Sequence, residues 1–163
     1  MTERPIRLFG DPVLKTPTVD VGVIDHRVRS LVQDLLDTVM IPGRAGVAAT
    51  QIGVGLRAFS YNVDGDVGYI LNPHLVEVSG EPELVEEGCL SVPELWFATK
   101  RFPFARVTGH DLEGTPIELS GTGLMAQALQ HETDHLDGYL YIDKLETPLR
   151  REAMKQIRES DWF

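Results

Sequence analysis

The sequence holds a single cysteine among its 163 residues. One thiol cannot form a disulfide within the chain, so the fold depends on a hydrophobic core, and 42% hydrophobic residues is enough for one. No run approaches the roughly 20 apolar residues that a membrane span needs. Residues 1–5 lack the apolar stretch of a signal peptide. We therefore expect one domain covering residues 1–163, in a cytoplasmic protein without a membrane partner.

Basic side chains are also scarce: 15 Lys and Arg stand against 25 Asp and Glu, and the formal net charge is -10. Such a charge repels phosphates, so we expect no recognition of a specific nucleic acid sequence. One basic group near the C-terminal end departs from this pattern, and a solvated helix face is its simplest interpretation. Its residues are Arg150, Arg151, Lys155 and Arg158.

Helical patterns occur near both ends of the chain. Residues 25–40 repeat apolar side chains at the helical period, Asp25 is suited to cap the first turn, and Pro42 follows the last one. A further helix, over residues 148–159, is predicted to open at Thr147, because threonine is a good N-cap and a following proline suits the first turn.

A third helix is predicted over residues 124–136, starting at Thr122 or Ser120 and ending near Gly138. Its apolar residues indicate that it is buried at the centre of the protein.

The middle of the chain has the composition of short strands separated by turn residues. Residues 62–66 and the Glu113-Gly114 pair have the chemistry of hairpin turns, and residues 44–51 are expected to form a loop. Together the elements predict an α+β fold with mainly antiparallel sheets around a central helix, and with N- and C-terminal helices. The expected strands are 56–61, 69–71, 74–78, 83–86, 104–112 and 116–119.

Residues 131–135 read His-Glu-Thr-Asp-His and lie within the expected central helix. His131 and His135 are four residues apart, so both imidazoles point from one face and can reach one metal ion. Glu132 would then lie beside a water bound to that ion. A metal site with an adjacent base is the arrangement of metal-assisted hydrolysis.

Two histidines need a further ligand, and no third histidine follows His135 at the spacing of the extended metalloprotease motif. Cys89, which we expect in a loop, is the best candidate, and three ligands would leave a fourth position for water. The alternative is that Cys89 is a small buried hydrophobic residue.

Three segments carry a resemblance to a known family. Residues 46–51 read Gly-Val-Ala-Ala-Thr-Gln, residues 87–91 read Glu-Gly-Cys-Leu-Ser, and residues 131–135 complete the set. In this order and spacing they resemble the three motifs of the peptide deformylases, over nearly the whole chain. One departure is Arg44, at the place of the first glycine of the first motif.

The resemblance implies a hydrolase that removes the formyl group from the N-terminal formylmethionine of newly made polypeptides. It implies Fe(II) as the working ion, while the ligand chemistry also allows Zn, Ni or Co. Its implied metal ligands are Cys89, His131 and His135, and Glu132 is the implied general acid and base.

The resemblance also implies how the substrate is held. The side-chain amide of Gln51 and the backbone N–H of Leu90 would stabilise the oxyanion. Backbone groups of Ala45, Gly46 and Gly88 would pair with an extended peptide, as an added strand does.

A substrate pocket is predicted from helix spacing. Leu124, Gln127 and Ala128 lie three or four residues apart on the His131 face, where they can line a pocket for a methionine side chain. Core packing explains Leu124 and Ala128 equally well, and Gln127 is polar where an apolar wall is expected. Trp96 and Phe97 are further candidates to flank the site, although both suit a core.

Two charged residues near the motifs carry separate expectations. Glu87 is expected to pair with Arg101 and to brace the cysteine segment, with a weak exposed ion pair as the alternative. Arg44 is expected at negative φ, with Gly43 taking the unusual turn and the arginine side chain projecting outward near the peptide entrance.

Two other functions remain open at this point. One is a zinc peptidase with a His-Glu-x-x-His motif, and the other is a catalytically idle, metal-binding homologue. For a deformylase, the basic C-terminal helix also suggests contact with the ribosome, from which the substrate emerges.

Overall fold

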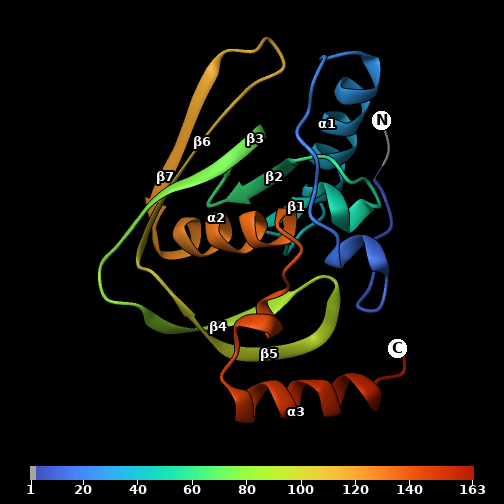
Figure 1. Cartoon of the computed structure of the whole chain (residues 1–163), viewed down its shortest axis with the longest axis vertical. Coiled ribbons are helices and arrows are strands. Elements are labelled where there is room, and N and C mark those ends of the chain that lie inside the picture. Colours follow the sequence, from blue (N-terminus) through green and yellow to red (C-terminus); the bar gives the residue numbers. More distant parts are fainter. Residues whose placement is uncertain (1–2) are drawn as a thin grey trace.

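Antiparallel strands and three α-helices make up residues 3–163, the part of the chain that this computed structural model describes (Figure 1). The helices are α1 (His26–Val39), α2 (Gly123–Leu136) and α3 (Thr147–Arg158). The strands are β1 (Gly46–Ala48), β2 (Ala58–Val63), β3 (Asp66–Ser79), β4 (Glu83–Cys89), β5 (Val92–Arg101), β6 (Phe104–His110) and β7 (Pro116–Thr122), and the 3-10 helices are η1 (Pro12–Lys15), η2 (Ala49–Ile52) and η3 (Tyr141–Lys144).

The larger sheet has five antiparallel strands in the order β1-β2-β3-β6-β7, and it packs a helix on each face. Successive strand residues point to opposite faces. Ala58 and Leu71 therefore join a core with α1, while Phe59 and Ile70 join a second core with α2. The sheet is thus buried on both sides at β2, which lies between the two helices.

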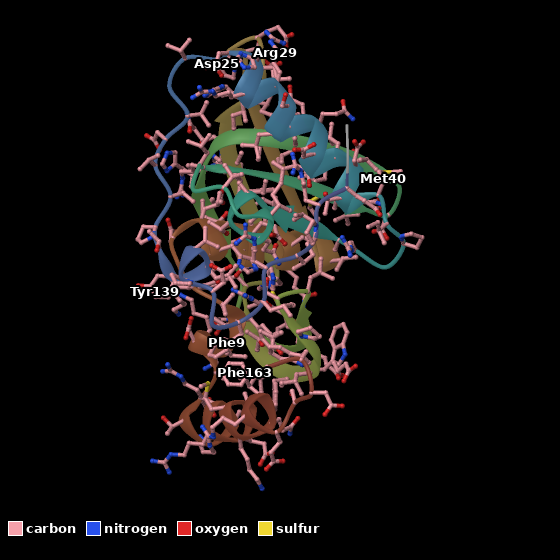
Figure 2. All side chains as sticks on the ribbon, turned by 90° about the vertical axis from the view of Figure 1, so that its right-hand side faces the viewer. Phe9, Asp25, Arg29, Met40, Tyr139 and Phe163 are labelled. Carbon is pink, nitrogen blue, oxygen red and sulfur yellow. The ribbon has the colours of Figure 1, made fainter. Side chains whose placement is uncertain are left out.

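The smaller sheet is the β4–β5 hairpin, which lies below α2 in Figure 1 with α3 beyond it. Val92 of the hairpin joins a third core with Ala153 and Ile157 of α3. The ring of Phe163 lies 5.9 Å from that of Phe9 at the same end of the molecule (Figure 2). The central helix α2 therefore lies between the large sheet and the hairpin, as the sequence predicts.

The helix ends confirm most of the expected capping. The carboxylate of Asp25 accepts hydrogen bonds from the backbone N–H groups of Arg27 and Val28, at the end of α1 opposite Met40 (Figure 2). Thr122 is the N-cap of α2, and α2 ends before Gly138 at φ +88°. The expected cap of α3 is wrong by one residue, because Glu146 is the N-cap and Thr147 is already helical.

Both predicted hairpin turns are confirmed. Val63 pairs with Asp66, which leaves Asp64 and Gly65 as a two-residue turn at φ +51° and +85°. Gly114 lies at φ +78° in the loop between β6 and β7.

Three expectations about the strands are wrong. The segment 44–51, expected to be a loop, contains β1 and most of η2. The sequence gives no sign of β1, because this strand is only three residues long and is buried throughout, so its side chains do not alternate between apolar and polar. The two strands expected at 69–71 and 74–78 are one, since a register shift between Leu71 and His74 accommodates Pro73. The sequence does not predict β5, because this segment becomes a strand through its pairing with β4 and not through a local pattern.

Within residues 3–163, no helix combines the length and the apolar character required to cross a membrane.

Candidate active site

Cys89, His131 and His135 come together at the end of β4 and on one face of α2. Their ligand atoms all lie within 4.8 Å of one another. The Nε2 atoms of His131 and His135 are 3.2 Å apart, and Cys89 Sγ is 3.4 Å from His135 Nε2. Cys89 is the last residue of β4 rather than part of a loop, so the expectation of a loop is wrong. The hairpin geometry places its sulfur at α2.

These separations fit a metal ion bound by three ligands. Metal–nitrogen bonds of about 2.0–2.1 Å at a tetrahedral angle place two nitrogen atoms about 3.3 Å apart. The 3.2 Å between the two Nε2 atoms matches this spacing. One thiolate and two imidazoles form a donor set that suits Zn, Fe, Ni or Co.

A network of ion pairs contacts the Nδ1 side of the His131 ring. His131 Nδ1 lies 2.5 Å from Glu87 Oε2, and Glu87 receives two hydrogen bonds from Arg101, at 2.9 and 2.6 Å. Arg101 also donates to Asp134 at 2.7 Å. Partners of this kind fix the ring orientation of a metal-binding histidine and leave its other nitrogen to face the ion.

The Glu87–Arg101 pair is buried rather than exposed, with side chains 2% and 6% accessible. The predicted pair is therefore confirmed, and its weak, exposed alternative is wrong. Burial alone would raise the pKa of Glu87, but hydrogen bonds from Arg101 and His131 outweigh burial and lower it to about 2. Glu87 is thus ionised at neutral pH and acts as a hydrogen-bond acceptor.

Glu132 is buried next to the metal-ligand cluster and packs directly against β1. A Cβ atom at Gly46 would lie 2.6 Å from Glu132 Oε2, so only glycine leaves room for the carboxylate there. Glu132 Oε1 has no hydrogen-bond partner within the described part of the chain. Burial raises the pKa of Glu132 to about 7, which suits a group that takes up and releases protons at neutral pH.

Gln51, which is 1% exposed, points its side-chain amide at the cluster. Its Oε1 accepts a hydrogen bond of 3.0 Å from the backbone N–H of Ala48. Its Nε2 donates to Ser91 Oγ at 3.2 Å and lies 3.7 Å from Cys89 Sγ. The amide N–H groups therefore face the side of the site where Cys89 lies.

A cavity of about 580 Å³ opens in front of the cluster. It lies between β1, the β4–β5 hairpin and α2, and His135 lies outside its lining. The other residues expected to bind the metal, catalyse the reaction or contact the substrate line this cavity, namely Ala45, Gly46, Gln51, Gly88, Cys89, Leu90, Leu124, Gln127, Ala128, His131 and Glu132.

The polar side chain of Gln127 has a structural explanation. Its Nε2 donates to the backbone carbonyl of Glu86 at 3.1 Å and lies 3.4 Å from Glu87 Oε1. The amide is therefore drawn toward β4.

The expectation that Trp96 flanks the site is confirmed, but sequence reasoning missed the strand β5 that carries it and the rest of its contribution to the cavity wall. Residues 92–95 and Trp96 line the cavity, and the Trp96 ring lies so close to Gly88 that a Cβ there would meet it at 2.7 Å. Phe97 does not flank the site, because it packs with the core of α3. The strand was unrecognised, so nothing in the sequence indicated which of its aromatic residues faces the cavity.

Arg44 lines the cavity but its guanidinium is not free. Gly43 has φ +90°, and Arg44 is not among the non-glycine residues with positive φ, which confirms the expected backbone. Arg44 Nη1 donates to the carbonyl of Thr38 at 3.1 Å, near the C-terminal end of α1. The expectation of an outward-projecting side chain is therefore wrong, because the orphan carbonyl of the helix end attracts the guanidinium.

The fold and the His-Glu-x-x-His helix with its cysteine partner define the class of the protein, a hydrolase with a candidate metal centre. A family model described as polypeptide deformylase matches residues 3–151. The chain belongs to the polypeptide deformylase family.

Sequence relatives span almost all of the chain. A peptide deformylase of Acidothermus cellulolyticus is 49% identical over 162 residues, which cover 99% of this chain and 89% of the relative. One of a Parafrankia species is 47% identical, with the same coverage of 99% and 89%.

Solved structures agree with the sequence relatives. A peptide deformylase from Legionella pneumophila superposes with a TM-score of 0.89 at 34% identity, covering 97% of this chain and 95% of that one. One from Thermus thermophilus has a TM-score of 0.88 at 35% identity, with the same coverage of 97% and 95%.

Proposed function

We propose that this chain is a metal-dependent hydrolase that removes the formyl group from the N-terminal formylmethionine of new polypeptides. Residues 1–163 act as one catalytic domain, and the nascent substrates imply action in the cytoplasm. The observation that carries the proposal is the convergence of Cys89, His131 and His135 close to Glu132 and next to the cavity.

Cys89, His131 and His135 hold the metal ion in the proposed mechanism. A bound ion supplies a water nucleophile at neutral pH and polarises the formyl carbonyl. We propose Fe(II) as that ion, on the strength of the family, while the same donor set accepts Zn, Ni or Co.

Glu132 moves the protons. Its carboxylate takes a proton from the attacking water and returns it to the departing amine nitrogen, which leaves formate and a free N-terminus. The burial that raises the pKa of Glu132 to about 7 supports both directions of transfer near neutral pH.

Gln51 and Leu90 hold the negative charge that develops on the formyl oxygen. The Gln51 amide faces Cys89, and Leu90 lines the cavity in the turn that directly follows Cys89. Donors fixed in a buried site lower the barrier because they need no reorganisation during the reaction.

The substrate peptide lies along the edge of β1. β1 is an outer strand of the five-stranded sheet, so backbone groups of Ala45 and Gly46 are proposed to pair with the peptide by strand addition, and Gly88 of β4 is proposed to contact it from the other side of the cavity. Leu124, Gln127 and Ala128 line the cavity from α2 and are proposed to receive the methionine side chain.

One anaerobic assay tests the function. The Fe(II)-loaded protein is expected to release formate from formyl-Met-Ala-Ser and to leave the internal bonds of unformylated Met-Ala-Ser intact. Cleavage of internal bonds would favour the zinc peptidase. Tight metal binding without any turnover would favour the idle homologue, although the intact Glu132 and Gln51 argue against it.

A further inference from the structure

We propose that Ser91 is a positioning residue that orients the side-chain amide of Gln51 for the reaction. The inference rests on the proposed function, in which Gln51 donates to the oxyanion. Ser91 is fully buried, and the cavity lining includes its neighbours Leu90 and Val92 but not Ser91 itself. Ser91 therefore acts on the substrate only through Gln51.

The orientation of the Gln51 amide is set from two sides. The backbone N–H of Ala48 donates to Oε1 at 3.0 Å, and a backbone N–H requires an acceptor. This bond assigns the oxygen to the β1 side, so Nε2 must face the opposite side. There it meets Ser91 Oγ at 3.2 Å.

Ser91 leaves one amide hydrogen for the site. Nε2 carries two hydrogens, and the hydroxyl oxygen of Ser91 accepts one of them. The second points to Cys89 Sγ, which accepts it at 3.7 Å on the side of the metal-ligand cluster. Without Ser91 Oγ a buried N–H would lack its acceptor, so the amide would rotate to find another one.

The N-terminal segment hydrogen-bonds to the backbone of both Gln51 and Ser91. The backbone N–H of Arg7 donates to the Gln51 carbonyl at 2.7 Å, and that of Phe9 donates to the Ser91 carbonyl at 2.8 Å. The two donors are two residues apart, whereas their acceptors are far apart in the sequence. One short segment therefore fixes the distance between the amide of Gln51 and the hydroxyl of Ser91.

Ser60 provides a matched control for the loss of a buried hydroxyl. It is also fully buried, and its Oγ donates to the carbonyl of Leu35 at 2.9 Å, on the α1 side of the sheet. Ser→Ala removes one buried hydroxyl oxygen at either position; at Ser60 this oxygen also contacts the carbonyl of Val47 at 3.4 Å. Only the change at Ser91 reaches Gln51.

The first experiment measures kcat and KM of the Fe(II)-loaded enzyme on formyl-Met-Ala-Ser, together with its metal content. Ser91→Ala is expected to keep its metal and lose about tenfold in kcat, with KM changed by less than about twofold. Ser91→Gly, which lacks the same acceptor, is expected to lose kcat equally. Ser60→Ala is expected to lower the Tm and to leave kcat unchanged.

The second experiment is a double-mutant cycle with Gln51→Ala. Removing an oxyanion donor costs about 10²–10³ in kcat, and in that background Ser91→Ala is expected to add less than about twofold. An unchanged kcat in Ser91→Ala, the same loss in both backgrounds, or loss of metal from Ser91→Ala would overturn the inference alone. Full activity of Gln51→Ala would overturn the proposed role of Gln51 as well.

Discussion

At the scale of single residues, the candidate site depends on two glycines whose missing Cβ atoms leave space for neighbouring side chains. Gly46 has no Cβ, and the space is taken by the carboxylate of Glu132. Gly88 likewise leaves room for the ring of Trp96. The two glycines, which the family resemblance assigns to substrate binding, thus also set where the Glu132 carboxylate and the Trp96 ring lie.

Removing the cysteine ligand tests the metal centre. Cys89→Ala is expected to lose its metal or to bind it much more weakly, because two imidazoles alone leave the ion half coordinated. Metal content after gel filtration gives the measurement, with Ser60→Ala as a control that keeps the ion. Full metal content and activity in Cys89→Ala would show that the ligand assignment is wrong.

Replacing the carboxylate of Glu132 by an amide tests its role in catalysis separately from metal binding. Glu132→Gln is expected to retain the metal and to lose about 10²–10⁴-fold in kcat, since glutamine has nearly the same shape but cannot carry the proton. Steady-state kinetics on a metal-replete preparation give the result. Wild-type turnover in that preparation would rule out the role of Glu132.

Arg44 is the residue at which this chain departs from the family motif, and it is expected to affect substrate preference. Its guanidinium is held at the cavity wall by the Thr38 carbonyl, so its charge has a defined place. A formyl-Met peptide with Asp at the third position is expected to have a kcat/KM up to about fivefold above one with Lys, the range of an exposed charge pair.

The matched variants are Arg44→Gly, in which this preference should vanish, and Arg44→Lys, in which it should persist. Identical ratios of kcat/KM for the two peptides in all three proteins would leave Arg44 without a role in specificity.

At the scale of elements, the β4–β5 hairpin and α2 are joined by charge. Glu87 comes from β4, Arg101 is the last residue of β5, and Asp134 comes from α2. Arg101 touches both carboxylates, so one side chain ties the cysteine-bearing hairpin to the histidine-bearing helix.

Removing the Arg101 guanidinium is expected to destabilise the protein. Arg101→Met leaves the carboxylate of Glu87 buried without its guanidinium partner, and loss of one member of a buried pair lowers the free energy of unfolding by about 3–5 kcal/mol. Arg106→Met is the control, because Arg106 forms its ion pairs with Glu77 and Glu118 at the surface. Urea unfolding should show a large change for the first variant and little for the second; equal changes would contradict this account.

At the scale of the whole molecule, an acidic chain exposes a group of four basic residues on α3, interspersed with Glu152 and Glu159. The net charge is -10, yet α3 exposes Arg150, Arg151, Lys155 and Arg158 on its outer side while Ala153 and Ile157 are buried. This exposed set is where a ribosome contact is proposed, because rRNA phosphates attract a local cluster of positive charge.

Charge reversal tests that contact. Replacing the four basic residues of α3 with glutamate is expected to weaken co-sedimentation with ribosomes and to leave deformylation of a free peptide unchanged. The control reverses Arg27 and Arg29, which are exposed on α1. Co-sedimentation that does not differ between the two variants would refute the contact.

The sequence alone determined the helices, two hairpin turns and the pairing of His131 with His135. These features follow local rules: Asp25 caps a helix from within its own turn, Asp64-Gly65 supplies positive φ, and the four-residue spacing of His131 and His135 places both rings on one face. The same spacing rules also located the α2 wall of the cavity.

Only the tertiary structure decided the rest, because it depends on partners distant in the sequence. β5 is a strand because β4 lies beside it, and Phe97 turns to the core of α3 while Trp96 faces the cavity. The guanidinium of Arg44 points to a helix end that no local pattern reveals. Side-chain direction is a property of the packed neighbours, and these are brought together only when the chain folds.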